Sequence, residues 1–315
     1  PPSVALVRVP DTVAALGDLG RYHRRRLKNL RVLAVTGSVG KTTTKDMAAS
    51  ILARCGPTLK TQGNWNTEIG VPLMLLRLRP EHRYAVLELA MRARGEIATL
   101  TRLVEPDIGI ITNIQETHLE LLGSQENIAR AKAELLEHLP AAGVAVLNAD
   151  DDWVRRMARY SRAPVVWYGW ERTAAYRAVK VAAGAQAVTF TVVDPDGHHH
   201  RLRVPVPGEH NVYNALAAVA ACRQAGADWE AISAGLAAVE LTGMRLEILE
   251  LGAITVVNDA YNANPQSTLA ALAALERLAA GRRRIVVLGD MLELGKMAEP
   301  GHQRVGRAVA RNRPA

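Results

Sequence analysis

The stretch that decides the fold reads Val32-Leu33-Ala34-Val35-Thr36-Gly37-Ser38-Val39-Gly40-Lys41-Thr42-Thr43-Thr44. Its apolar start predicts a buried strand at 32–35, and the spacing of apolar residues predicts a helix at 41–55. The glycines therefore lie in the turn between a strand and a helix. Backbone N–H groups in such a turn, and at the start of the helix, direct partial positive charge at phosphate oxygens. The sequence predicts a phosphate-binding loop from Gly37 to Thr42.

The residue types in this loop predict a nucleoside triphosphate with magnesium. Lys41 is expected to neutralise the β- and γ-phosphates of ATP, and the Thr42 hydroxyl to hold Mg²⁺. The backbone of the remaining loop residues would surround the phosphates: Gly37, Ser38, Val39, Gly40 and Thr43. The alternative is a glycine turn that merely starts a helix. The general pattern also has a glycine five positions before Gly40, where this chain has Val35.

Outward from the loop, short β-rich runs alternate with helical periods. Strands are predicted at 84–89, 108–111 and 144–147, and helices at 96–103, 125–139 and 152–160. Such alternation is typical of a mostly parallel sheet flanked by helices, here of the phosphate-loop type. A period of two at 187–193 and 200–206, around Asp194-Pro195-Asp196-Gly197, predicts a small antiparallel ribbon.

Three segments are expected along the chain. Residues 1–30 read as a linker helix, because apolar residues at 12–27 have helical spacing. Residues 31–243 form the central ATP-binding domain and end in alanine-rich helices at 212–224 and 229–239. Residues 244–315 then read as a partial Rossmann-like α/β domain, with strands at 247–250, 254–258 and 285–288 and a helix at 266–279. That last segment is short for a doubly wound sheet, so we expect a fragment.

Composition narrows the class of protein. The chain has 315 residues, of which 49% are hydrophobic, so two or more domains are expected. No apolar run approaches the roughly 20 residues of a membrane span and no signal peptide is evident, so a cytoplasmic protein without membrane insertion is the default. The net charge of +8 suits a polyanionic partner, but a single phenylalanine argues against stacking on nucleic acid. We expect a monomer that binds no nucleic acid.

Several motifs, in order along the chain, resemble the Mur ligase family of bacterial cell-wall synthesis. The first is the short loop form Gly37-Ser38-Val39-Gly40-Lys41-Thr42-Thr43, and the second is Asn64-Trp65-Asn66-Thr67-Glu68-Ile69-Gly70. Asn258-Asp259-Ala260-Tyr261-Asn262-Ala263-Asn264-Pro265 is the most family-specific string after the loop, and Gly289-Asp290-Met291-Leu292-Glu293-Leu294-Gly295 follows it. The resemblance spans about residues 12–310 and implies the family's central ATPase domain with part of its C-terminal domain.

The resemblance implies a set of metal ligands. Glu88 and His118 match residues that bind magnesium in the family, and Lys132 matches a lysine that is carbamylated there. A carbamate suits this role because it is an anion with oxygen donors, which a hard cation requires. The alternatives without a metal-binding role are a solvated strand-end glutamate, a surface histidine and a solvated helix lysine.

The resemblance also implies a substrate and nucleotide surface. Asn64, Asn66 and Thr67 would line the substrate cleft, and the segment of Asn211 and Asn214 would reach the adenine. From the later domain, Arg245 would contact the nucleotide phosphates, and Asp259 would face ATP. Substrate contacts are further implied for Tyr261, Asn262 and Asn264. Asn264 also reads as the cap of a helix that begins with Pro265, and both roles are compatible.

The Gly289–Gly295 string and the Asn64 segment favour the subgroup that joins D-alanyl-D-alanine to UDP-N-acetylmuramoyl-tripeptide. Lys41, Lys132, His118 and Arg245 are then the expected catalytic residues, with ATP and Mg²⁺ as cofactors. For a chain that lacks most of the N-terminal domain, we expect weak nucleotide binding and little or no turnover. The open alternatives are a sister ligase of the muramoyl-peptide or folylpolyglutamate type, a noncatalytic nucleotide-binding module and, more distantly, a nucleic-acid translocase.

Overall fold

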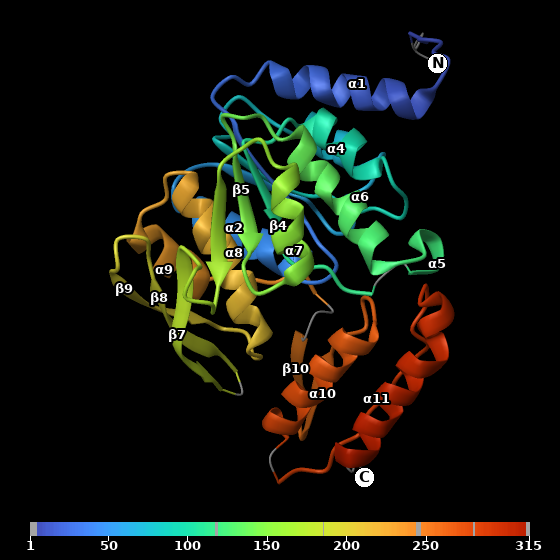
Figure 1. The fold of residues 1–315 in the computed structure, drawn as a ribbon, viewed down its shortest axis with the longest axis vertical. Helices are drawn as coiled ribbons and strands as arrows, with labels where there is room; N and C mark the ends of the chain where they lie inside the picture. The colour runs from blue at the N-terminus through green and yellow to red at the C-terminus, as the bar shows by residue number, and fades with distance from the viewer. Residues whose placement is uncertain (1–4, 117–118, 185, 244–246, 280, 313–315) are drawn as a thin grey trace.

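A sheet of nine strands organises residues 31–204. The computed structural model describes residues 5–116, 119–184, 186–243, 247–279 and 281–312. The strands lie in the order β2-β3-β1-β4-β5-β6-β7-β8-β9 (Figure 1). Their bounds are β1 Arg31–Thr36, β2 Thr58–Lys60, β3 Tyr84–Glu88, β4 Ile108–Ile111, β5 Val144–Asn148, β6 Val165–Gly169, β7 Tyr176–Ala183, β8 Val188–Val193 and β9 His199–Val204.

The strand before the loop lies inside the parallel part of this sheet. β1 pairs in parallel with β3 on one side and β4 on the other, and the parallel pairing continues from β4 through β7. Parallel strands place their carboxyl ends at one edge, so the residues that follow them meet there. The last two pairings, β7 with β8 and β8 with β9, are antiparallel. The predicted parallel sheet with an antiparallel ribbon is confirmed.

Helices cover both faces of the sheet. Leu33 and Val35 point into a core shared with α2, α8 and α9, whereas Val32 and Ala34 point into a second core shared with α3, α4, α6 and α7. A strand that is apolar on both faces suits a sheet buried on both faces. The helices are α1 Thr12–Arg25, α2 Lys41–Leu52, α3 Gly70–Leu76, α4 Glu96–Val104, α5 Leu119–Leu122, α6 Gln125–His138, α7 Asp152–Met157, η1 Ala158–Tyr160, α8 His210–Gln224 and α9 Trp229–Ala237.

The helix expected at 12–27 is present as α1, which packs against α3 and α4. Asp11 caps it by accepting hydrogen bonds from the N–H groups of Val13 and Ala14. At its other end, Arg21 and Arg25 bind the carboxylate of Glu105, just after α4. The helix is therefore attached to the central sheet through the helices that cover it.

The later part of the chain is smaller and lies at one end of the molecule (Figure 1). It contains the antiparallel pair β10 Glu247–Leu251 and β11 Ile254–Asn258, with α10 Pro265–Leu278, η2 Gly295–Met297 and α11 Ala298–Asn312. The strand predicted at 285–288 is wrong, because those residues form no strand in the structure. Ile285 is 69% exposed and Val287 91% exposed, so the side chains of this apolar run are not buried as the predicted strand requires.

Within the described residues, no helix combines the length and the apolar character needed to cross a membrane.

Candidate functional site

The loop between β1 and α2 depends on two glycines. Gly37 and Gly40 have φ angles of +145° and +84°, a region that side chains with a Cβ rarely adopt. A Cβ on Gly37 would lie 1.9 Å from Oγ1 of Thr112, and one on Gly40 would lie 2.3 Å from Oδ1 of Asn214. The loop is therefore packed too closely from behind for any larger residue, and its open side faces the cleft.

The residues after β4 hold the loop in place. The Ser38 N–H donates to the Asn113 carbonyl at 2.9 Å, and the Val39 N–H donates to Oδ1 of Asn113 at 3.0 Å. Gln115 adds a third link, because its N–H donates to Oγ of Ser38 at 2.9 Å. Asn113 closes the strand beside β1, so the parallel sheet itself sets the shape of the loop.

Lys41 and Thr42 begin α2. The ammonium of Lys41 curls back and donates to the carbonyls of Gly37 at 3.0 Å and Ser38 at 3.1 Å. The Thr42 hydroxyl donates to Oε2 of Glu88 at 2.8 Å. Lys41 is thus placed over the loop, as expected for a phosphate-binding lysine, while Thr42 faces the end of β3.

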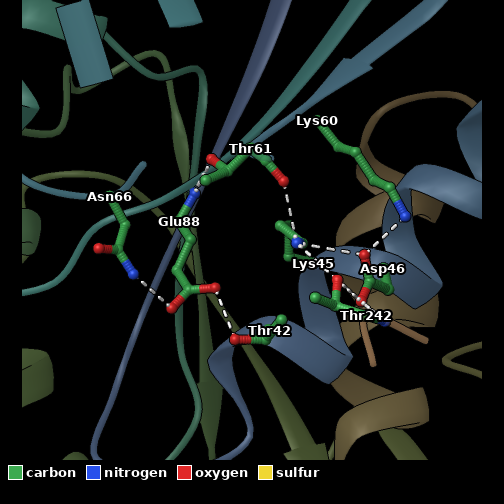
Figure 2. A network of polar contacts seen from close by, with 8 residues as sticks. All are labelled: Thr42, Lys45, Asp46, Lys60, Thr61, Asn66, Glu88 and Thr242. Atoms are coloured by element: carbon green, nitrogen blue, oxygen red, sulfur yellow. Dashed lines mark hydrogen bonds and ion pairs between the residues drawn. The ribbon is translucent and has the colours of Figure 1, made fainter. Parts of the chain in front are cut away.

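Glu88 ends β3 and is only 2% exposed. Its second oxygen accepts a hydrogen bond from Nδ2 of Asn66 at 3.0 Å (Figure 2). A buried carboxylate and a threonine hydroxyl in direct contact form the kind of oxygen donor set that Mg²⁺ prefers. The structure thereby brings Thr42, Asn66 and Glu88 together from three separate segments, and they fit a magnesium ion.

Lys132 lies on α6 and is also 2% exposed. Burial lowers its pKa well below the ordinary value of 10.5, and the nearby Lys41 ammonium lowers it further. A lysine with a depressed pKa carries an uncharged, nucleophilic amine in a larger fraction of molecules. The bland alternative of a solvated helix lysine is wrong for Lys132, because its side chain is buried close to the loop lysine.

Two predicted catalytic residues, His118 and Arg245, lie outside the described residues, so their roles stay predictions. Asn64 and Thr67 are described and exposed, on the segment between β2 and α3. Of that predicted substrate segment, only Asn66 bonds to Glu88.

Asn211 and Asn214 support the loop from behind. Both are buried, with Asn214 donating to Oδ1 of Asn211 at 3.0 Å and Asn211 donating to the Pro207 carbonyl at 2.7 Å. Oδ1 of Asn214 also accepts from the Thr44 hydroxyl at 3.4 Å, and it lies where a Cβ of Gly40 would be. These asparagines line the cleft, but their hydrogen bonds connect the start of α8 to Pro207 and to Thr44 of α2. Their contact with adenine stays a prediction.

A cleft of about 1160 Å³ runs from the loop to the later part of the chain. Val39, Gly40 and Thr43 line it on one side, and Asp259, Asn262 and Asn264 line it on the other. Oδ1 of Asn264 also accepts from the N–H groups of Gln266 and Ser267, which confirms its capping role for α10. Tyr261 is 38% exposed and does not line the cleft.

Sequence reasoning missed one wall of this cleft. The carboxylate of Asp150 accepts from the N–H groups of Trp170 at 2.7 Å and Glu171 at 3.1 Å. The ring of Trp170 lies 5.7 Å from that of Tyr213 on α8. Among the described residues, Oε1 of Gln115 is buried without a hydrogen-bond partner. Asp150 and Trp170 follow parallel strands, so the rule that ligands bind at carboxyl ends could have found them.

Comparison with known proteins agrees with the family resemblance of the sequence motifs. A family model described as the Mur ligase middle domain matches residues 35–222, and one described as the Mur ligase glutamate ligase domain matches residues 244–313. The UDP-N-acetylmuramoyl-tripeptide–D-alanyl-D-alanine ligase of Bacillus subtilis is 39% identical over 311 residues, which are 98% of this chain and 66% of that protein. The ligase of the same name from Escherichia coli is 40% identical over 306 residues, 96% of this chain and 66% of its own length.

Solved structures agree with the sequence relatives. A crystal structure of MurF from Acinetobacter baumannii superposes with a TM-score of 0.91 at 37% identity, over 99% of this chain and 68% of that one. The MurF ligase from Thermotoga maritima, solved in complex with ADP, superposes with a TM-score of 0.86 at 27% identity, over 98% of this chain and 70% of that one. This chain spans 66% of the length of the first two curated relatives.

Proposed function

Because the chain belongs to the Mur ligase family, we propose that it carries out ATP-dependent amide-bond formation between UDP-N-acetylmuramoyl-tripeptide and D-alanyl-D-alanine in peptidoglycan precursor synthesis. The curated relatives from Bacillus subtilis and Escherichia coli are named for this pair of substrates. The proposal extends their activity to a chain that spans 66% of their length.

One observation carries the proposal: Lys41 bonds back over the glycine loop and Thr42 contacts Glu88 where the loop meets α2, with Lys132 buried nearby. Bound Mg–ATP would supply the phosphoryl group that activates the terminal carboxylate of the tripeptide as an acyl phosphate. The dipeptide amine would then attack the acyl carbon, phosphate would leave, and the nitrogen would lose a proton as the amide forms. Fixed cationic groups stabilise charge on a transferring phosphoryl group.

The residues divide this work between them. Lys41 neutralises phosphate charge from its position over the loop, and Thr42 and Glu88 offer oxygen ligands to magnesium. His118 would complete the metal set, as the family resemblance implies. From the later part of the chain, Asp259 lines the cleft, and Arg245 is proposed to contact phosphate. Excluding water from the cleft would protect the acyl phosphate from hydrolysis.

Carbamylation of Lys132 is part of the proposal. CO₂ reacts with the uncharged amine, and the depressed pKa of Lys132 increases that form at neutral pH. The carbamate is an anion, so the Lys41 ammonium that disfavours a protonated Lys132 would favour the adduct. The change converts an unfavourable pair of cations into a favourable ion pair and adds oxygen donors for a metal.

We also propose a monomeric enzyme that works in the cytoplasm, with ATP and Mg²⁺ as cofactors.

One experiment tests the proposed function against a sister ligase. It measures phosphate release from ATP with UDP-N-acetylmuramoyl-tripeptide in the presence and absence of D-alanyl-D-alanine. We expect slow release that requires both substrates and disappears in Lys41→Ala. Release that responds instead to glutamate with folate, or to another amino acid, would move the chain to a sister ligase. Activity unchanged in Lys41→Ala would refute the enzyme assignment.

A further inference from the structure

Two charged residues of α2 are fully buried yet face away from the loop. The side chains of Lys45 and Asp46 are both 0% exposed. Burying a charge is unfavourable unless partners compensate it, so a neighbouring pair of buried charges in one helix needs an explanation. Neither residue lines the cleft. The explanation must therefore lie in the residues that Lys45 and Asp46 bind outside the cleft.

Asp46 binds the chain where it leaves the central part. Its Oδ2 accepts from the Thr242 N–H at 2.9 Å and from the Thr242 hydroxyl at 2.8 Å (Figure 2). Its Oδ1 accepts from Nζ of Lys60 at 2.7 Å and lies 3.2 Å from Nζ of Lys45. Burial acts to raise the pKa of the Asp46 carboxyl, but Lys45, Lys60 and Thr242 together hold it below its ordinary value. The carboxylate is thus charged at neutral pH and holds both polar groups of Thr242.

Lys45 connects the same cluster to the candidate metal ligands. Its ammonium donates to the Thr61 carbonyl at 3.0 Å and to the Thr242 hydroxyl at 3.5 Å. Oγ1 of Thr61 accepts from the Glu88 N–H at 2.9 Å, and the Glu88 carboxylate binds Thr42. One network centred on α2 therefore joins the end of β3 to Thr242 (Figure 2).

Thr242 has a particular place in the chain. The family model for the later domain begins at residue 244, and the first strand of that part, β10, begins at Glu247. The cleft has residues of both parts in its walls, so its shape depends on where the later part lies relative to the loop. Besides this cleft, η2 of the later part lies against α5. Thr242 therefore lies at the junction between the parts of the chain that form the two walls of the cleft.

We propose that Asp46 is a positioning residue that attaches Thr242 to the helix of the phosphate-binding loop, and so sets the placement of the later part across the cleft. Lys45 and Lys60 keep Asp46 ionised, and Thr242 supplies two hydrogen bonds to one oxygen. Asp46 does not line the cleft. The proposal rests on the proposed function only in that a ligase needs both walls of the cleft, and the attachment can be measured without turnover.

The decisive variant is Thr242→Val, which removes the hydroxyl while keeping the size of the side chain and every charge. Thr242→Ser keeps the hydroxyl. Thr58→Val is a matched control because the hydrogen bond that its hydroxyl makes within the described residues is local, to the Gly56 carbonyl at 2.8 Å. Asp46→Asn is the stronger change, but it leaves Lys45 beside an uncharged group and can unfold the protein. The experiment therefore relies on the three threonine variants.

The measurement is the distance distribution between spin labels on Arg162→Cys and Ala310→Cys, in a Cys55→Ser background. Both labelled positions are exposed, and Cys222 is buried. We expect Thr242→Val to shift or broaden the distribution, and Thr242→Ser and Thr58→Val to leave it as in the parent. A distribution unchanged in Thr242→Val would overturn the proposal, as would an equal change in Thr242→Ser.

ADP affinity, measured by calorimetry, separates this role from a general effect on the loop. Thr242→Val is expected to retain ADP affinity within about threefold, because the loop glycines and Lys41 keep their contacts. In a ligase assay, its kcat should fall while the KM for ATP stays nearly constant. A tenfold or greater loss of ADP affinity would place the role of Thr242 in the loop and refute the proposal. Absence of ligase turnover in every variant, with the expected distance change, would count against the proposed function alone.

Discussion

The contact between Thr42 and Glu88 offers the sharpest test of the site. Thr42→Val removes the hydroxyl without changing the size of the side chain, and both residues are nearly fully buried, at 3% and 2% exposed. A hydrogen bond to a charged group contributes about 1.5–3 kcal/mol. The Glu88 carboxylate would retain its bond from Asn66 but lose the 2.8 Å bond from Thr42. We therefore expect the free energy of unfolding to fall by about 1.5–3 kcal/mol.

The same change should affect nucleotide binding in a metal-dependent way. If Thr42 also binds magnesium, Thr42→Val removes a metal ligand and should weaken ADP binding with Mg²⁺ by about tenfold or more. A tenfold loss of affinity corresponds to about 1.4 kcal/mol. ADP binding without metal should change little. Thr42→Ser retains the hydroxyl and serves as the control in both denaturant unfolding and calorimetry. A Thr42→Val variant with parental stability and parental Mg²⁺-dependent affinity would refute the reasoning.

Three further changes test separate parts of the structure. Gly40→Ala places a Cβ 2.3 Å from Oδ1 of Asn214 at a φ of +84°, so ADP affinity and thermal stability should both fall, and Asn214→Ala should restore part of the stability. Burial lowers the pKa of Lys132, so the unfolded chain binds this proton more tightly, and stability should rise with pH up to about 10.5. Lys132→Met should be more stable than the parent at neutral pH and lose this part of the pH dependence, and an identical pH profile would contradict the burial. Asn264→Ala removes the cap of α10 and should cost about 1 kcal/mol in chemical denaturation, whereas no loss would contradict its capping role.

Local patterns were sufficient for most of the central fold. The loop, β1 and α2 were predictable because an apolar strand, glycines and a helix start occur together within 13 residues. The prediction at 254–258 matches β11, and the helix expected at 266–279 is α10 within one residue at each end. The strand expected at 285–288 failed because an apolar run becomes a strand only if a neighbour supplies hydrogen bonds.

The candidate site depended more on the fold. Family resemblance singled out Glu88 and Lys132, but nothing local could show that Glu88 contacts Thr42 across 46 residues of sequence. The hydrogen bonds that Asn214 makes with Asn211 and Thr44 were likewise not visible in the motif, and its predicted contact with adenine stays a prediction. Family resemblance can single out candidate site residues, but it does not show which atoms each of them contacts.

By itself, the sequence predicted a phosphate-binding loop and a parallel sheet around it, because both predictions depend on residues close together in the chain. Only the tertiary structure decided the lowering of the Lys132 pKa and the attachment of Thr242 to Asp46. A pKa depends on the water that folding removes and on the charges it brings near. Lys41 and Lys132 are 91 positions apart in the sequence, and only folding brings Lys41 close enough for its charge to lower the pKa of Lys132.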